Sequence, residues 1–236
     1  MGREQGAAAV PAETGRAAAG TAYRQIRFAM PAGATEVLLV RHGESEAADP
    51  DRPFPLVDGR GDPMLSPLGH EQAERVAARL APTRLNAIYV TSLRRTVETA
   101  APLAARLGLV PEVEPDLAEV HLGEWEGGTY RQRVLEGDPL AAMIFEQERW
   151  DLIPGAESNA SVAARVSSAI GRIAERHEGA RVVCFAHGGT IGAVLAIATG
   201  SRPFAFIGSD NAAISTIVVA RPRWLLRGFN DRSHLE

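Results

Sequence analysis

Short runs of branched apolar residues recur along the chain, separated by longer stretches in which apolar positions repeat with helical spacing. The runs at 37–40, 87–90 and 181–186 are too short for helices that span a core, and their composition is typical of strands buried on both faces. The apolar spacing, with capping residues and prolines at the ends, predicts helices at 66–81, about 94–107, most of 129–148 with a break at 137–139, about 158–176, and 188–199. This alternation predicts an α/β fold, a three-layer αβα sandwich around a mainly parallel central sheet.

Several further segments lie outside this alternation. Two strands at 214–220 and 224–229 are predicted as a hairpin around 221–223, and 109–113 is predicted as a short edge strand. Proline, aspartate and glycine are frequent at 46–61, which predicts a loop. Residues 1–30 are rich in alanine and glycine and poor in large apolar groups, so we expect a flexible N-terminal extension followed by a single domain over 31–236.

Composition and charge restrict the partners of the protein. The 236 residues are 45% hydrophobic, and a formal net charge of −4 disfavours nucleic acid and anionic membrane surfaces as partners. The single cysteine, Cys184, excludes an intramolecular disulfide and a cysteine metal cluster. No apolar segment reaches the length of a membrane-spanning helix or fits a signal peptide. We therefore expect a cytoplasmic protein whose oligomeric state stays open, with a homodimer as one option.

The residues with the most distinctive chemistry follow the predicted strands. Arg41, His42 and Gly43 come directly after the first strand, two arginines at 94–95 follow the second, and His187 follows the third. Ligands of open α/β sheets bind beyond the carboxyl ends of the strands, so neighbouring strands would bring two imidazoles and two guanidiniums together. Helices starting after Gly43 and after His187 would add free backbone N–H groups. These groups together predict a phosphate pocket. We expect no metal and no cofactor.

Four short motifs follow one another along the chain in a characteristic order. They are Arg41-His42-Gly43-Glu44, the arginine pair at a helix start, the carboxylate-rich segment 116–127 and His187-Gly188. Together they resemble the histidine phosphatase superfamily, which includes the cofactor-dependent phosphoglycerate mutases. The resemblance extends from about residue 37 to about residue 229 and implies a phosphoglycerate mutase-like fold.

The resemblance also implies roles for individual residues. His42 matches the histidine that attacks phosphorus and becomes a phosphohistidine. Arg41, Arg95 and His187 match the groups that hold the transferring phosphoryl group, and the backbone of Gly188 joins them. Gly43 and Ser45 complete the expected substrate site.

A phosphoryl-transfer site of this kind also needs a proton donor for the leaving alkoxide. By the same resemblance Glu119, two residues after Leu117, is the proton donor and later the base that activates water. Glu124 and Glu126 lie close by in the sequence and are competitors for this role. His187, on an apolar strand, would by default be a hydrogen-bonded core histidine, but its place at a strand end before two glycines favours a functional role.

Two positions depart from the pattern of the family. Many members have asparagine six residues after the nucleophile, where this chain has Ala48, so one donor is missing or supplied elsewhere. The arginine motif usually follows a serine, where this chain has Thr91. Neither position is the nucleophile or the acid, so the departures bear on substrate preference.

The function expected from these residues is a metal-independent phosphatase, a phosphomonoester hydrolase of the histidine acid phosphatase type acting on a small phosphorylated substrate. The segment 122–127 resembles the phosphatase branch of the family. One alternative is a cofactor-dependent phosphoglycerate mutase, which would return the phosphoryl group to a bound acid. The other is a non-catalytic module that binds a phosphorylated ligand, which would not require a proton donor. The sequence does not indicate which compound is the natural substrate.

Overall fold

The computed structural model describes residues 23–236, so most of the predicted N-terminal extension (residues 1–30) lies outside the described residues. Residues 23–30 are exposed and form no helix or strand. The central sheet draws its strands from residues 35 to 231. We therefore keep as a proposal that 31–236 form one domain.

The sheet at the centre of the molecule has six strands in the order β5-β4-β6-β1-β7-β8. Neighbouring strands of the series β5, β4, β6 and β1 pair in parallel, whereas β7 and β8 are antiparallel. The strands are β1 (Thr35–Arg41), β4 (Ala87–Val90), β5 (Glu112–Val113), β6 (Arg181–Ala186), β7 (Ile214–Ala220) and β8 (Arg223–Asp231). The predicted α/β fold and its mainly parallel sheet are confirmed, including the C-terminal hairpin and the short edge strand.

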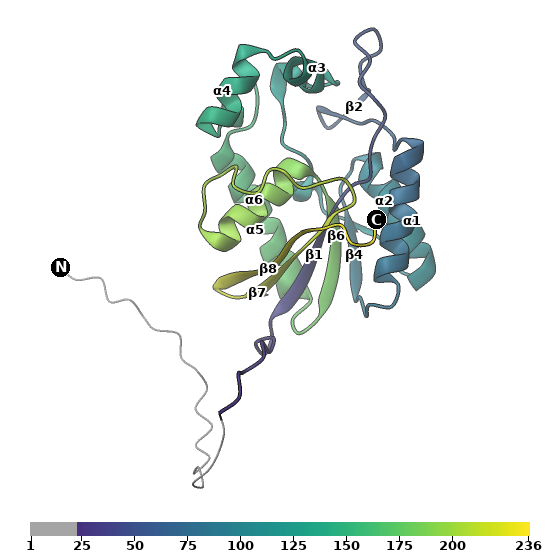
Figure 1. Cartoon of the computed structure of the whole chain (residues 1–236), viewed down its shortest axis with the longest axis vertical. Helices are drawn as coiled ribbons and strands as arrows, with labels where there is room; N and C mark the ends of the chain where they lie inside the picture. Colours follow the sequence, from purple (N-terminus) through teal and green to yellow (C-terminus); the bar gives the residue numbers. More distant parts are fainter. Residues whose placement is uncertain (1–22) are drawn as a thin grey trace, which may run out of the picture.

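Helices cover both faces of this sheet (Figure 1). On one face lie α1 (Pro67–Leu80) and α2 (Arg94–Leu107), and on the other α5 (Asn159–Arg176) and α6 (Gly188–Thr199). Alternate side chains of β1 separate the two cores: Leu38 and Val40 belong to the core under α1 and α2, whereas Val37 and Leu39 belong to the core under α5 and α6. The strands are therefore apolar on both faces, which explains their continuous apolar runs.

Shorter elements lie over the carboxyl edge of the parallel strands (Figure 1). They are α3 (Thr129–Leu135), α4 (Pro139–Gln147), the 3₁₀ helices η1 (Pro115–Leu117), η2 (Gly123–Trp125) and η3 (Trp150–Leu152), and a small hairpin of β2 (Leu56–Val57) and β3 (Arg60–Gly61). This hairpin falls in the segment predicted as a loop. The break between α3 and α4 falls at the glycine and proline predicted to interrupt the helix.

Local sequence explains where the long helices begin. The Ser66 hydroxyl accepts a hydrogen bond from the Gly69 N–H, 3.1 Å away, and Ser158 caps α5 in the same way. The expectation of a helix after Gly43 is wrong, because residues 44–66 form turns, isolated bridges and the β2–β3 hairpin, and the next helix is α1. Several prolines in this segment oppose a helix, and Gly43 is packed so closely that an added Cβ would lie 2.6 Å from the Gly69 carbonyl oxygen.

The register of the central strands determines which side chains meet above the sheet. Arg41 pairs with Ala186 across the parallel β1 and β6, so His42 and His187 emerge from adjacent strand ends. On the other side of β6 lies β4, which leads into the arginines at the start of α2. Within residues 23–236, no helix combines the length and apolar character needed to cross a membrane.

Candidate active site

His42 has a defined hydrogen-bonding pattern. Its side chain is 4% exposed, and its Nδ1 atom lies 2.7 Å from the Gly43 carbonyl oxygen. Because a carbonyl only accepts, Nδ1 carries the hydrogen and the Nε2 lone pair is left for attack. Burial, followed by the positive charges of Arg95 and Arg41, lowers the pKa of His42 well below its usual value of 6.5. The ring is therefore neutral at physiological pH, the form that can act as a nucleophile.

His187 lies beside His42, with the two ring centroids 5.2 Å apart. Its side chain is fully buried, and Nε2 lies 3.0 Å from the Thr91 hydroxyl oxygen. Nδ1 has no hydrogen-bond partner among the residues that the structure describes. Burial and the charge of Arg95 hold the pKa of His187 well below its usual range, so this ring too is neutral. It can serve as a hydrogen-bond donor through a ring N–H.

Arg41 and Arg95 bring two guanidiniums to the same place. The Nη1 atom of Arg41 donates to the Ser209 carbonyl at 2.5 Å, and Nη1 of Arg95 donates to the Gly61 carbonyl at 2.8 Å. Burial lowers the pKa of Arg95 to about 10, which still leaves it charged at neutral pH. Within residues 23–236, neither arginine forms an ion pair with a carboxylate. Their charges are available to an anion.

Glu119 faces the first turn of α6. Its carboxylate accepts hydrogen bonds from the backbone N–H groups of Thr190 (3.2 Å), Gly189 (3.4 Å) and its own neighbour Val120 (2.9 Å). The N-terminus of a helix favours negative charge, so α6 positions this carboxylate. Its backbone carbonyl is fixed in turn, accepting from Arg60 Nε at 2.6 Å.

The two competing carboxylates are placed differently. Glu126 lines the same cavity, but its two oxygens accept from the N–H groups of Gly61 and Leu122 at 2.8 and 2.7 Å, which gives it a role in holding two loops together. Glu124 is exposed and does not line the cavity.

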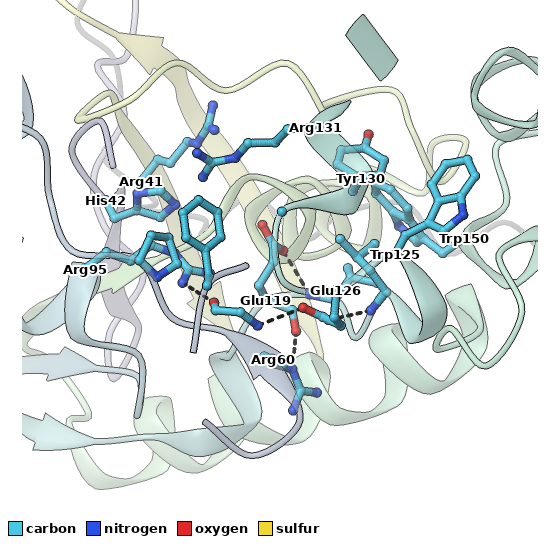
Figure 2. Close-up of a pocket in the computed structure, with 16 residues that line it drawn as sticks. Arg41, His42, Arg60, Arg95, Glu119, Trp125, Glu126, Tyr130, Arg131 and Trp150 are labelled. Atoms are coloured by element: carbon cyan, nitrogen blue, oxygen red, sulfur yellow. Dashed lines mark hydrogen bonds between the residues drawn. The ribbon is translucent and has the colours of Figure 1, made fainter. Parts of the chain in front are cut away.

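Arg41, His42, Arg95 and Glu119 line a cavity of about 240 Å³, whereas the fully buried His187 lies beside His42 and is not one of the lining residues. Arg41, His42 and Arg95 lie on one side of the cavity, the aromatic side chains of Trp125, Tyr130 and Trp150 lie on the other, and Glu119 lies between them (Figure 2). Phe54 also lines the cavity, next to Arg131. Trp125 is buried in the core and also lines this cavity. Burial raises the pKa of Tyr130 to about 12, so its hydroxyl stays protonated.

The remaining predicted residues lie around this cavity. The Gly43 N–H already donates to the Thr99 hydroxyl at 3.0 Å. The Ser45 hydroxyl accepts from Arg131 at 2.7 Å. Gly188 begins α6 against Arg41, whose Nε would lie 3.5 Å from an added Cβ at this position. Arg94, the other arginine of the pair, forms an ion pair with Asp62 at 3.2 Å and is not one of the residues lining the cavity.

Sequence reasoning missed part of the site. Arg131, Tyr130 and Phe54 reach the cavity from α3 and from the loop before β2, segments without a recognisable motif. An arginine on a short helix resembles any solvated surface residue, and only the folding of α3 over the strand ends reveals its position.

Known proteins resemble this chain in sequence and in structure. A sequence model of the histidine phosphatase superfamily (branch 1) matches residues 37–232. A metal-independent phosphoserine phosphatase of Arabidopsis thaliana is 34% identical over 207 residues, covering 85% of this chain and 83% of the relative. Phosphoglycerate mutase-like protein 4 of the same plant is 33% identical, over 85% of this chain and 87% of the relative.

Solved structures share the fold. A mycobacterial glucosyl-3-phosphoglycerate phosphatase has a TM-score of 0.70 at 28% identity, over 84% of this chain and 99% of that chain. Phosphoglycerate mutase from Bacillus anthracis has a TM-score of 0.72 at 21% identity, over 86% of this chain and 96% of that chain, a likeness that concerns the fold alone. The predicted phosphoglycerate mutase-like architecture is thus confirmed, and all the candidate site residues fall inside the region that the superfamily model matches.

Proposed function

The chain belongs to the histidine phosphatase superfamily (branch 1), and we propose that it hydrolyses small phosphomonoesters without a metal, through a phosphohistidine on His42. The resemblance inferred from its four motifs is confirmed by this membership. Relatives that are phosphatases support a hydrolase acting on phosphate esters. The single observation that carries the proposal is a neutral His42 with a free Nε2, buried beside two guanidiniums that lack carboxylate partners within residues 23–236.

In the first step, Nε2 of His42 attacks phosphorus and the P–O bond to the leaving group breaks. The Glu119 carboxyl donates its proton to the departing alkoxide. The new P–N bond places a positive charge on the imidazole, and the Nδ1–H donated to the Gly43 carbonyl at 2.7 Å stabilises that charge.

In the second step, the Glu119 carboxylate takes a proton from water, and the resulting hydroxide attacks the phosphohistidine. The P–N bond breaks, inorganic phosphate leaves, and His42 returns to its neutral form. Glu119 has then regained the proton that it gave up, so both residues are restored and no further reactant is consumed.

The remaining groups stabilise the transferring phosphoryl group. Arg41 and Arg95 bind its equatorial oxygens, and His187 donates a ring N–H to them. An arginine in this position contributes about 10³ to 10⁵ in rate in other phosphoryl-transfer enzymes, so replacing either one should nearly abolish turnover. The proposal includes the expectation that the enzyme is cytoplasmic and its substrate a small metabolite.

A phosphoglycerate mutase is the second candidate function, because one relative of nearly equal similarity is phosphoglycerate mutase-like. A mutase would protect the phosphohistidine from water and return the phosphoryl group to bound phosphoglycerate. The mutase reading requires interconversion of 2- and 3-phosphoglycerate that depends on 2,3-bisphosphoglycerate. Absence of that reaction would eliminate it.

The test of the hydrolase is release of inorganic phosphate from p-nitrophenyl phosphate and from a panel of metabolite esters, with and without EDTA. We expect turnover that EDTA leaves unchanged. His42→Ala should release no phosphate, and intact-protein mass spectrometry after rapid quenching should detect one added phosphoryl group on the wild type only. If the wild type binds phosphate esters but never hydrolyses one, the protein is a binding module and the proposal is wrong.

A further inference from the structure

Among the residues that the structure describes, Arg131 alone lines the cavity with a charge that is unpaired and that the proposed mechanism does not use. It stands in α3, and its guanidinium reaches across to the segment that follows His42 (Figure 2). Nη2 donates to the Ser45 hydroxyl at 2.7 Å and Nη1 donates to the Glu46 carbonyl at 2.8 Å. The guanidinium carbon also lies 5.3 Å from the ring centroid of Phe54. These contacts hold the guanidinium on the side of the cavity where the nucleophile lies.

The positive charge of Arg131 has no carboxylate partner within residues 23–236. Arg133, on the same helix, shows the ordinary alternative, since it is exposed and pairs with Asp138 at 3.2 Å. Two carboxylates do line the cavity, Glu119 and Glu126, but backbone N–H groups hold both of them. Burial and the nearby positive charge of Arg41 lower the pKa of Arg131. The second of these effects arises because positively charged side chains lie close together at this cavity.

Small side chains allow α3 to come this close. A Cβ added at Gly128, the residue before α3, would lie 3.0 Å from the Cβ of Ala48 and 3.3 Å from the ring of Phe54. Ala48 is also the position at which the sequence lacks a polar donor. The alanine and the glycine therefore permit the contact that brings Arg131 over the segment following His42.

We infer that Arg131 is a third guanidinium that binds the phosphoryl group of the substrate, a catalytic residue supplied by α3 in addition to Arg41 and Arg95. A transferring phosphoryl group has three equatorial oxygens, and three guanidiniums can meet them. Of the five N–H groups of Arg131, two are used by Ser45 and Glu46, which leaves three for an oxyanion. This inference rests on the proposed function, because it assigns the reacting group to the same cavity.

The experiment compares Arg131→Met and Arg131→Lys with the matched control Arg133→Met. Orthovanadate, an analogue of the transferring phosphoryl group, is the probe, and its affinity is measured by calorimetry without any turnover. Turnover is measured with p-nitrophenyl phosphate, which carries no second anionic group, and with 3-phosphoglycerate, which carries a carboxylate. Thermal unfolding of each variant confirms that it is folded.

We expect Arg131→Met to weaken vanadate binding by about 10- to 100-fold, the range for losing a hydrogen bond to a charged group. It should lower kcat/KM by the same factor for every ester that the wild type hydrolyses. Arg131→Lys should keep part of the affinity because it keeps the charge, and Arg133→Met should stay within about twofold of the wild type.

Two results would overturn the inference. Unchanged vanadate affinity with a loss confined to 3-phosphoglycerate would show that Arg131 binds a carboxylate. Unchanged affinity and turnover would show that it only supports the loop. If the wild type hydrolyses no ester but binds vanadate through Arg131, the phosphoryl-binding role of Arg131 stands while the proposed hydrolysis and any catalytic role fail, so the two outcomes are distinguishable.

Discussion

The Thr91 hydroxyl oxygen lies 3.0 Å from Nε2 of His187, and Nδ1 of the same buried ring has no partner among the described residues. The Thr96 hydroxyl donates to the Leu93 carbonyl at 2.8 Å, so Thr96 does not need to be the donor to Thr91. The Thr91 hydrogen is then available to Nε2, which leaves the ring hydrogen on Nδ1. In this arrangement Thr91 selects the His187 tautomer with its hydrogen on Nδ1, and in the proposed mechanism this N–H would be the donor to a phosphoryl oxygen.

Replacing Thr91 with valine should therefore impair catalysis more than it impairs folding. The shape is retained, but Nε2 of His187 loses its partner, and leaving such a buried group unsatisfied costs about 1–3 kcal/mol. We expect kcat/KM for p-nitrophenyl phosphate to fall about 5- to 100-fold, and the pH profile of the rate to change. Thr91→Ser keeps the hydroxyl and should remain close to the wild type. A fully active Thr91→Val would contradict the role given to this hydroxyl.

Glu119→Gln tests the identity of the proton donor through the leaving group. An alkoxide needs a proton as it departs, whereas p-nitrophenolate is stable without one. We expect kcat/KM for an alkyl phosphate to fall about 10²- to 10⁴-fold. For p-nitrophenyl phosphate, the rate of the single-turnover burst of p-nitrophenolate should fall much less. The glutamine retains the size of the side chain, so the cavity should keep its shape.

The matched controls are Glu124→Gln and Glu126→Gln. Glu124 is exposed and should show no dependence on the leaving group. Glu126→Gln disturbs the contacts to Gly61 and Leu122, so it should lower the rates with the alkyl phosphate and with p-nitrophenyl phosphate by the same factor. If instead either control reproduced the pattern expected of Glu119→Gln, the proton donor would have been assigned to the wrong carboxylate.

Much of the fold follows from local patterns in the sequence. Apolar runs identified the central strands, and capping residues such as Ser66 and Ser158 marked the starts of α1 and α5. The strand-end positions of His42 and His187 correctly suggested that they would meet, because parallel strands place their carboxyl ends along one edge.

The sequence was a poorer guide to everything that crosses the top of the sheet. The sequence predicts a helix after Gly43, but none forms there. The Gly43 N–H donates to the Thr99 hydroxyl and Gly43 packs against Gly69, and both partners are distant in sequence. Arg131 reaches the cavity from α3, where Gly128, the residue before that helix, packs closely against Ala48. Such contacts depend on tertiary packing between separate segments, and no local periodicity encodes them.

The two buried histidines make stability depend on pH. In the folded chain the pKa of both His42 and His187 lies well below 6.5, mainly because of burial, whereas in the unfolded chain both return to about 6.5. As the pH falls below about 6.5, the unfolded chain takes up two protons that the folded chain does not. Below about pH 6.5, each histidine should therefore lower the free energy of unfolding by about 1.4 kcal/mol for every pH unit. Above about pH 7, the two histidines should not change the free energy of unfolding.

Urea unfolding between pH 7.5 and 5.5 checks this dependence. The double variant His42→Asn/His187→Asn removes both groups while keeping all other titrating residues, so the difference between its slope and that of the wild type isolates the pair. We expect the wild type to lose stability more steeply as the pH falls. Parallel slopes would mean that the two rings are protonated in the folded protein and cannot be the neutral groups that the mechanism needs.

Gly189 lies where the first turn of α6 meets the proposed acid. An added Cβ would lie 2.8 Å from Oε1 of Glu119 and 2.9 Å from Cγ2 of Val120, so one or both of these side chains would have to move. The glutamate can move because it is flexible, but it would then leave the position that two N–H groups of α6 define. Gly189→Ala should therefore keep the fold and lose activity.

The size of both effects can be bounded. Alanine favours a helix over glycine by about 1 kcal/mol, which offsets part of the cost of the contact, so the free energy of unfolding should change little. A displacement of about 1 Å at a catalytic group can cost on the order of 10²-fold in rate, and we expect at least a tenfold loss of kcat with alkyl phosphates. Gly171→Ala, in α5, is the matched control because its Cβ would meet nothing within 4 Å. Gly171→Ala should stabilise the protein by up to about 1 kcal/mol and leave kcat unchanged. If Gly189→Ala were as active as Gly171→Ala, Glu119 would not need the α6 N-terminus for its role.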